Sequence, residues 1–354
     1  MRATTRDVAV VATAQTVHRR AVPELSEVEM IQPVIHEVLD AVGGIGQIDF
    51  TCSGSTDYLA GQGFSFVGTL DGVGPSPPIS ESHVEADGAW ALYEAWVKIQ
   101  TGAADTALVY SYGKSSPGDL PRVLSRQLDP YYYGPLWPDS VSLAALQARA
   151  LLDSGKATER DLAEIAVRSR AAAKDNPYAT VSGDFDVDAI LAEDPLVAPL
   201  RKHDCPPISD GAVAVVLAAD DRARELTDNP AWIRGIEHRI DMHALGLRDL
   251  TDSPSTRLAA EAAGVHDGPI DVAELHAPFT SQEVILREAV GLGEGVDINP
   301  SGGALAANTM MAAGLVRIVE LANRVAAGTA GRGVAHATSG HCLQQNLICV
   351  LEGT

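Results

Sequence analysis

Short apolar segments that alternate with segments of helical periodicity restrict what this chain can fold into more than any other feature. Residues 7–14 (DVAVVATA) are short, apolar and rich in β-branched side chains, which is typical of a buried strand. Residues 24–42 follow with helical spacing, with Ser26 as a helix N-cap and Gly43–Gly44 as a stop. Strands and helices that alternate over short links predict an α/β fold. In the same half of the chain we expect further strands at 48–52, 105–113 and 211–219, and a further helix at 86–100.

The same alternation starts again after residue 230. This repetition predicts a duplicated α/β unit, although the two halves share no sequence identity that would support it. We place the first half at residues 1–225 and the second at residues 226–354. The expected strands of the second half are 233–237, a segment that ends at Leu275, 333–338 and 347–352, and its expected helices are 254–263, 281–290 and 309–327.

Residues 114–140 interrupt the alternation, because they are rich in Pro, Gly and aromatic residues and show no clear period. Long loops without a period are usually functional in compact domains. Helices are expected after this stretch at 140–154 and 159–173, the second with Thr158 and Asp161 as a capping pair, and a loose segment follows at 174–208. Together these segments predict a loop subdomain at about 114–208 that covers a site. Tyr132 and Trp137 in it are candidates to line an apolar pocket for a hydrophobic ligand, and packing within the loop is the alternative.

The charge balance excludes some classes of partner. Among 354 residues, 26 Lys and Arg stand against 47 Asp and Glu, which gives a formal net charge of −21. So acidic a chain is not expected to bind nucleic acid or an anionic membrane, although a local basic patch can still hold a phosphate-bearing ligand. No apolar run approaches membrane-spanning length, and residues 1–16 lack the apolar core and cleavage site of a secretory leader. We therefore expect a cytoplasmic protein.

The four cysteines do not predict a disulfide framework or a zinc ribbon, because no two of them form a CxxC pair. We expect no metal site. Cys52, Cys205 and Cys349 lie in or beside strand-like apolar segments and are expected to be core thiols. The fourth is Cys342, in a loop-like stretch near the C-terminus.

Five segments spread over most of the chain carry a resemblance to a known family. In their order they resemble the thiolase superfamily, and in particular the sterol-carrier-protein-x thiolases and the bacterial lipid-transfer-protein branch. The succession of SDGAVAVVL, ELHAPFT and NPSGG is the most specific part of the match. The segments are DVAVVATAQT at 7–16, ISDGAVAVVLA at 208–218, ELHAPFTSQE at 274–283, NPSGGALAAN at 299–308 and LICVLE at 347–352.

The resemblance implies two similar α/β halves in a five-layered αβαβα sandwich, with a loop subdomain inserted between them and a tight homodimer. It also implies an acyl-CoA substrate and no resident cofactor, since CoA is part of that substrate. The lipid-transfer-protein branch is similar to aldolases that shorten branched or steroid side chains. Those aldolases work with a partner that carries an OB-fold and a zinc ribbon, so the resemblance implies such a partner here.

The positions of the two family cysteines hold other residues. The thiolase nucleophile sits at the N-terminus of a buried helix, where the helix dipole favours a thiolate. Its Cys-x-x-Gly motif falls on Glu85-Ala86-Asp87-Gly88, so Glu85 stands in the nucleophile position, either as a functional carboxylate or as an acid that only satisfies the helix dipole. The second cysteine falls near Ser339-Gly340-His341-Cys342, where Cys342 is displaced and His341 is a candidate proton carrier.

The resemblance also assigns an oxyanion-binding role. His276 matches the histidine of the HDxF motif, with Ala277 in place of the Asp, and Asn308 matches the histidine of the GHPxGA motif. Both side chains can donate hydrogen bonds to a thioester carbonyl or its enolate. A structural histidine and an ordinary helix N-cap are the alternatives. Gly302 and Gly303 in NPSGG permit close approach to a ligand, or serve a tight turn.

Thiolysis needs an acyl-cysteine and a second cysteine, and neither is in place on this alignment. A retro-aldol cleavage of a β-hydroxyacyl-CoA needs only a base and donors to the thioester enolate. We therefore predict an aldolase-type lyase, with His276 and Asn308 as donors and Glu85 or His341 as the proton-transfer group. The alternatives are a non-catalytic acyl-CoA- or sterol-binding protein or scaffold, and a thiolase that uses a relocated Cys342 or Cys52.

Overall fold

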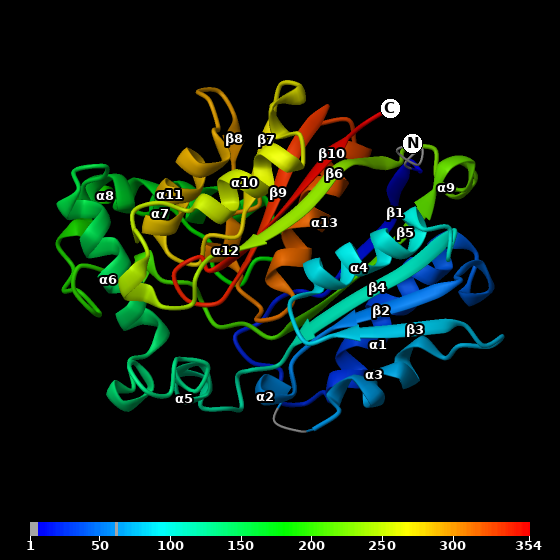
Figure 1. The fold of residues 1–354 in the computed structure, drawn as a ribbon, viewed down its shortest axis with the longest axis horizontal. Helices are drawn as coiled ribbons and strands as arrows, with labels where there is room; N and C mark the ends of the chain where they lie inside the picture. The colour runs from blue at the N-terminus through cyan, green and yellow to red at the C-terminus, as the bar shows by residue number, and fades with distance from the viewer. Residues whose placement is uncertain (1–5, 61–62) are drawn as a thin grey trace.

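A computed structural model describes residues 6–60 and 63–354. In these residues the strands form one sheet in the order β3-β2-β4-β5-β1-β6-β10-β9-β7-β8, which runs through the molecule from edge to edge (Figure 1). The first five strands are β1 (Val8–Gln15), β2 (Phe50–Gly54), β3 (Ser80–Val84), β4 (Thr106–Gly113) and β5 (Gly211–Ala219). The second five are β6 (Ala231–Ile240), β7 (Val272–Leu275), β8 (Asp297–Ile298), β9 (Arg332–Ser339) and β10 (Gln345–Glu352).

The two halves of this sheet have the same topology. In the first half β1 and β4 both run antiparallel to β5, and β2 runs parallel to β4 and β3. In the second half β6 and β9 both run antiparallel to β10, and β7 runs parallel to β9 and β8. The predicted duplication is therefore confirmed. One feature was not predicted: Val8–Val10 pair with Ala231–Ile233, and this short antiparallel ladder joins the two half-sheets.

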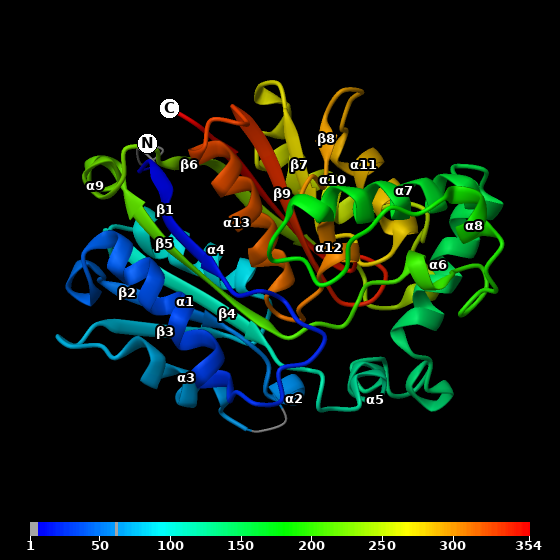
Figure 2. The same ribbon diagram turned by 180° about the vertical axis from the view of Figure 1, so that it is seen from behind.

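Helices form three layers around and between the half-sheets. The helices α4 (Gly88–Gln100) and α13 (Ala313–Ala326) lie between them and share one apolar core with both. The helix α1 (Glu27–Val42), backed by α3 (Ser65–Val73), covers the outer face of the first half-sheet. The helices α10 (Pro254–Ala262) and α11 (Thr280–Val290) cover the outer face of the second (Figures 1 and 2). The predicted αβαβα layering is confirmed.

Capping residues set the helix boundaries where the sequence suggested them. Ser26 and Glu29 form a capping box at the start of α1, and Gly43 ends the helix with a left-handed φ of 92°. Thr158 and Asp161 form a second capping box at the start of α7 (Glu159–Ala172). These local signals act within a few residues, which explains why the sequence alone reveals them.

The stretch between β4 and β5 contains the helices expected at 140–154 and 159–173, together with two shorter helices that were not expected. It contains α5 (Leu120–Ser125), α6 (Ser140–Asp153), α7 and α8 (Val187–Leu191), which extend beyond the sandwich on one side (Figure 2). The division that we place after residue 225 stays a prediction, and it falls within the short helix α9 (Asp220–Leu226), before β6. No helix among the described residues is long and apolar enough to cross a membrane.

The expected helix 309–327 begins later than predicted. The chain turns at 308–312, where Met311 adopts a left-handed φ of 69°, and α13 starts at Ala313. Tertiary bonds hold this turn, because the carbonyl of Met311 accepts from Gly88 N at 2.8 Å and from Ser111 Oγ. The turn places Asn308 outside the helix, so Asn308 is not its N-cap.

Gly113, at the end of β4, lets the 308–312 turn pack closely. A Cβ at this position would lie 2.1 Å from the carbonyl oxygen of Met310. We expect Gly113→Ala to lower the free energy of unfolding by about 1–3 kcal/mol in urea titrations, since the backbone must move. Gly46→Ala is the control, because nothing lies within 4 Å of its Cβ position. Equal stability of the two variants would contradict this packing.

Candidate active site

His276 follows the last residue of β7, and its backbone fixes the ring. Its N–H donates to the carbonyl of His336 on β9 at 3.2 Å. The ring Nδ1 accepts from the backbone N–H of Thr338 at 3.3 Å, so the ring proton belongs on Nε2. Nε2 lies 3.1 Å from Oδ1 of Asn308 and donates to it. The structure therefore brings together His276 and Asn308, which are 32 residues apart in the chain.

The imidazole of His276 is neutral. Its pKa is lowered to about 3, mainly by burial and also by the nearby His336 and Arg317, while the hydrogen bond to Asn308 opposes these effects. At neutral pH the ring thus acts as a hydrogen-bond donor. A pKa this low disfavours a role for His276 in carrying a proton at neutral pH.

Asn308 is held on two sides and open on a third. Its backbone N–H donates to Ser209 Oγ at 3.0 Å, and its Oδ1 is occupied by His276. Among the described residues, the amide Nδ2 has one hydrogen-bond partner, the sulfur of Met310 at 4.0 Å, and a thioether is a weak acceptor. Asn308 and His276 each keep 7% of their surface exposed, whereas His336 keeps none. The amide N–H₂ of Asn308 is therefore available to a stronger acceptor.

The ELH and NPSGG motifs are joined by hydrogen bonds next to the His276–Asn308 pair. Ser301 donates to Glu274 through its N–H at 3.0 Å and its hydroxyl at 2.7 Å, and Arg317 on α13 pairs with the same carboxylate at 3.0 Å. Asn299 Oδ1 accepts from the N–H of Leu275 at 2.6 Å. Burial raises the pKa of Glu274, and Arg317 opposes that rise. These bonds fix the end of β7 and hence the position of His276.

A second buried chain of polar groups supports the neighbouring residue, Thr309. Its hydroxyl lies 2.8 Å from His18 Nδ1, and His18 Nε2 lies 3.2 Å from Gln15 Oε1. Gln15 in turn donates to Glu320 on α13 at 2.8 Å. Burial lowers the pKa of His18 to about 3, so this histidine is also neutral. Sequence reasoning missed His18, because only the tertiary fold brings it beside the 308–312 turn.

Glu85 lies just after β3 and not at the helix N-terminus. Its side chain is half-exposed. Oε1 accepts from Thr56 Oγ1 at 2.6 Å and from the N–H of Asp57 at 3.1 Å. Nε2 of His83 lies 3.5 Å from Oε2, and Nδ1 of the same ring lies 2.9 Å from Ser53 Oγ. Glu85 is thus a positioned carboxylate at the ends of β2 and β3.

Asp87, which the sequence analysis did not single out, holds the helix N-terminus instead. It caps α4 by accepting from Ala89 N at 2.9 Å, and it also accepts from Gly314 N at 2.9 Å and Leu315 N at 3.0 Å at the start of α13. Burial raises its pKa to about 6, while these N–H groups favour the anion. One carboxylate thus joins the N-termini of the two central helices. An Asp directly before a helical segment was the available signal.

The loop after β9 contains the other two candidates, His341 and Cys342. Burial lowers the pKa of His341, and the backbone of Leu124 on α5 opposes that shift. Cys342 is buried, its Sγ lies 3.5 Å from the carbonyl of Leu143, and burial raises the pKa of its thiol to about 11. Among the described residues, no hydrogen bond connects this loop's His341 or Cys342 side chains to His276 or Asn308.

The chain offers no activated thiol. All four cysteines are buried and free. Burial raises the thiol pKa to about 12 in Cys52, Cys205 and Cys349, as it does to about 11 in Cys342. A nucleophilic thiolate requires a lowered pKa. Within residues 6–60 and 63–354, no group of three His, Cys, Asp or Glu side chains is arranged to hold a metal ion.

The remaining candidates lie in two other settings. Gly302 and Gly303 form a tight turn with φ of 91° and 62°, and a Cβ on Gly302 would lie 2.7 Å from that of Ala173. The close approach in NPSGG is therefore between this turn and the end of α7.

Tyr132 is 77% exposed and Trp137 is 56% exposed, on the outer surface of the subdomain.

Sequence comparison identifies relatives of this chain. No family model matches it. An acetyl-CoA acetyltransferase from Methanothermobacter thermautotrophicus is 30% identical over 255 residues, which cover 64% of this chain and 66% of that protein. Sterol carrier protein 2 from Rattus norvegicus is 24% identical over 292 residues, which cover 69% of this chain and 52% of that protein. The chain belongs to the thiolase superfamily. It spans about half to two thirds of the length of these relatives.

Two solved structures share the fold over nearly the whole chain. The "Ltp2-ChsH2(DUF35) aldolase" matches with a TM-score of 0.81 at 19% identity, over 98% of this chain and 97% of that chain. Human mitochondrial 3-ketoacyl-CoA thiolase matches with a TM-score of 0.75 at 16% identity, over 99% of both chains. At such identities the likeness establishes the fold alone.

The pKa of His276 has a consequence for stability. Between about pH 3 and pH 6.5 the unfolded chain binds a proton at this position and the folded protein does not, so stability falls as the pH drops below 6.5. From pH 7 to pH 5 the loss is about 2 kcal/mol. The His276→Gln variant can keep a donor to Asn308 but has no imidazole to protonate. In urea unfolding, its free energy of unfolding should fall from pH 7 to pH 5 by about 2 kcal/mol less than that of wild type. An unchanged loss would mean that His276 titrates as it does in the unfolded chain.

Proposed function

We propose that this chain is an aldolase-type lyase that cleaves the Cα–Cβ bond of a β-hydroxyacyl-CoA through a thioester enolate. The observation that carries the proposal is the His276–Asn308 pair, in which a neutral imidazole orients an amide donor. Such a donor suits an oxygen that gains negative charge in the transition state. The buried, weakly acidic thiols argue against a covalent acyl-enzyme.

In the proposed reaction a base removes the proton of the β-hydroxyl, the Cα–Cβ bond breaks, and a ketone leaves. The bonding electrons move to Cα and the thioester oxygen, and Asn308 Nδ2 donates to that oxygen. His276 acts as a positioning residue, because its Nε2–H is already directed to Asn308 Oδ1. The enolate then takes a proton at Cα to give the shortened acyl-CoA. No resident cofactor is needed for these steps.

Glu85 is the base that the geometry favours over His341. Its half-exposed carboxylate is held by Thr56 and Asp57, whereas His341 is turned toward Leu124. The segment that contains Glu85 also adjoins the Asn308 turn, since Gly88 N donates to the carbonyl of Met311. A substrate whose hydroxyl carbon is tertiary, in a steroid or branched side chain, fits this chemistry because it cannot be oxidised for thiolysis.

The aldolase neighbour is a complex that includes a DUF35 component, and the fold match covers nearly all of this chain. We infer that this chain also works with an OB-fold and zinc-ribbon partner, and as a homodimer. The acetyltransferase relative supports a second candidate, acyl transfer to or from CoA. A non-catalytic acyl-CoA- or sterol-binding role is the third.

The lyase proposal is tested with a β-hydroxyacyl-CoA that carries a tertiary hydroxyl, supplied with and without the partner. We expect a ketone and a shortened acyl-CoA, both detected by mass spectrometry. Asn308→Ala should lower the rate about 10²–10³-fold, since one oxyanion donor is lost. Asn229→Ala, at an exposed position, is the matched control.

Two outcomes would decide against the lyase. CoA-dependent cleavage of a 3-ketoacyl-CoA, with no ketone from the hydroxy substrate, would support the acyltransferase. Binding of acyl-CoA without turnover, and without an effect of Asn308→Ala on product formation, would support the binding protein. Glu85→Gln and His341→Gln assayed side by side identify the base, because the variant at the base loses the limb of the pH profile that reports its deprotonation.

A further inference from the structure

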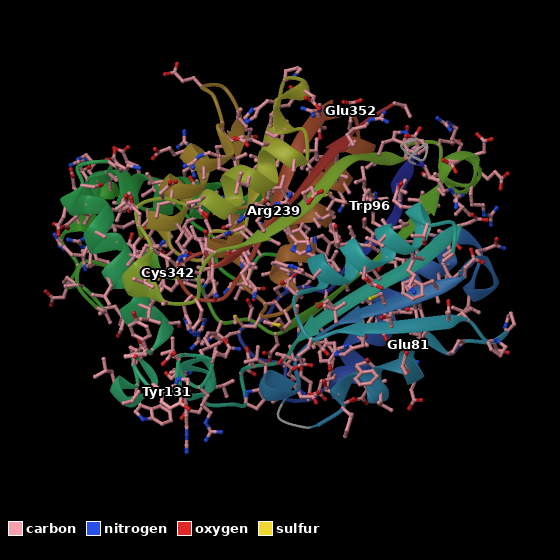
Figure 3. The ribbon with its side chains drawn as sticks, in the orientation of Figure 1. Glu81, Trp96, Tyr131, Arg239, Cys342 and Glu352 are labelled. Atoms are coloured by element: carbon pink, nitrogen blue, oxygen red, sulfur yellow. The ribbon has the colours of Figure 1, made fainter. Side chains whose placement is uncertain are left out.

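Three polar side chains form a connected row at the edge of the first half-sheet. Ser53 on β2 and His83 on β3 are direct partners in the parallel ladder, and Ser53 Oγ lies 2.9 Å from His83 Nδ1. Glu85 follows the end of β3, with its Oε2 3.5 Å from Nε2 of the same ring. Figure 3 labels Glu81 on this strand, which forms the free edge of the half-sheet. The row therefore runs from the interior of the sheet to a half-exposed carboxylate.

The row has the composition of a serine-hydrolase triad, but its burial runs in the opposite direction. In such a triad the serine reacts with the substrate, and the carboxylate is buried behind the histidine. Here Ser53 is 1% exposed, whereas the side chains of His83 and Glu85 are 14% and 53% exposed. Ser53 is therefore an anchor for the ring, and Glu85 is the end of the row that a substrate can reach.

The ring proton of His83 belongs on Nε2. A proton on Nδ1 alone would turn the Nε2 lone pair toward the Glu85 carboxylate, and repulsion between them disfavours that tautomer. With the proton on Nε2, Nδ1 accepts from the hydroxyl of Ser53 instead. Phe66 on α3 stacks on the ring, with centroids 4.5 Å apart and planes 13° apart, and so fixes the ring plane. The Nε2–H is therefore directed at Glu85.

This Nε2–H is a buried donor that the fold does not satisfy. Among the described residues Nε2 of His83 has no hydrogen-bond partner, because its 3.5 Å separation from Glu85 Oε2 is longer than a normal N–H···O bond. A buried donor without a partner is unfavourable and calls for an explanation. Catalytic hydrogen bonds that are long before substrate binds often shorten in the complex. Glu85 Oε2 is the acceptor to which this donor is directed.

The surroundings of Glu85 leave one position on its carboxylate open. Each carboxylate oxygen has two lone pairs, and both of those on Oε1 are used by Thr56 Oγ1 and Asp57 N. On Oε2 one lone pair faces the Nε2–H of His83. We propose that His83 is a positioning residue, whose Nε2–H fixes Oε2 so that its second lone pair takes the proton of the substrate's β-hydroxyl. This inference rests on the proposed function, in which Glu85 is the base.

In this step the O–H bond of the β-hydroxyl breaks, and its proton forms a bond to Oε2 of Glu85. The electron pair left on the oxygen forms the C=O bond of the ketone. The electron pair of the breaking Cα–Cβ bond passes to the thioester enolate. Glu85 then gives its proton to Cα of the enolate. The proton on Nε2 of His83 stays in place throughout, so the histidine acts only through Glu85.

The test compares His83→Leu, which removes the donor, with His83→Gln, which can keep one. In the cleavage assay His83→Leu should lower kcat about 10²-fold with little change in KM, the loss expected when a reacting group is displaced by about 1 Å. His83→Gln should recover most of kcat. In a Glu85→Gln background His83→Leu should have no further effect, because the two residues act as a unit. His36→Leu, at an exposed position on α1, is the matched control.

Nitrogen NMR of labelled histidine rings gives a readout that needs no turnover. In the neutral ring of His83 we expect a protonated Nε2 and an unprotonated Nδ1, and Glu85→Gln should change the Nε2 resonance. A proton on Nδ1, or an equal loss of kcat from His83→Leu with and without Glu85, would overturn the role.

The two assays separate this inference from the proposed function. If the NMR result is as expected but wild type cleaves no substrate, the lyase fails and this role fails with it, while the His83–Glu85 contact stands. If wild type cleaves the substrate and His83→Leu cleaves it at the same rate, the positioning role fails and the lyase stands.

Discussion

The hydrogen bond from Nε2 of His276 to Oδ1 of Asn308 determines what this site can do. It depends on a neutral ring, which burial imposes, and on the N–H of Thr338, which places the ring proton on Nε2. Because Oδ1 of Asn308 is occupied, the amide N–H₂ faces away from its support. Three motifs far apart in the sequence maintain this geometry: Ser209 holds the backbone of Asn308, and the Glu274–Ser301 contact holds the strand that ends at His276.

The duplicated scaffold explains why the site lies at the start of the two central helices. The helices α4 and α13 occupy equivalent places in the two halves, each after the third strand of its half. Their N-termini meet at the buried carboxylate of Asp87. Where a thiolate would use the helix dipole, this chain places an anion that is already saturated with N–H donors. In the proposed reaction this region supplies the Asn308 donor for the acyl oxygen, and Glu85 is the base.

Much of the fold could be predicted from the sequence, because strand and helix periodicity and the caps at Ser26 and Thr158 are local signals. The pairing of β1 with β6 was not predictable, since it depends on how the halves meet. Motif matching identified His276 and Asn308, which the fold brings into contact. It did not identify His18 or His336, because the partners that place them are distant in sequence. Asp87 carried a local N-cap signal, but its bonds to the start of α13 depend on the tertiary fold. The helix after Asn308 begins four residues late, since contacts with Gly88 and Ser111 hold the preceding turn.

The central claim is that Asn308 binds the oxygen of an activated acyl group without a covalent bond to sulfur. A crystal structure with a non-cleavable β-hydroxyacyl-CoA analogue tests this most directly. The account predicts the thioester oxygen within about 2.7–3.2 Å of Asn308 Nδ2, with His276 still bonded to Oδ1. A thioester placed away from Asn308, or an acyl group attached to a cysteine, would contradict it.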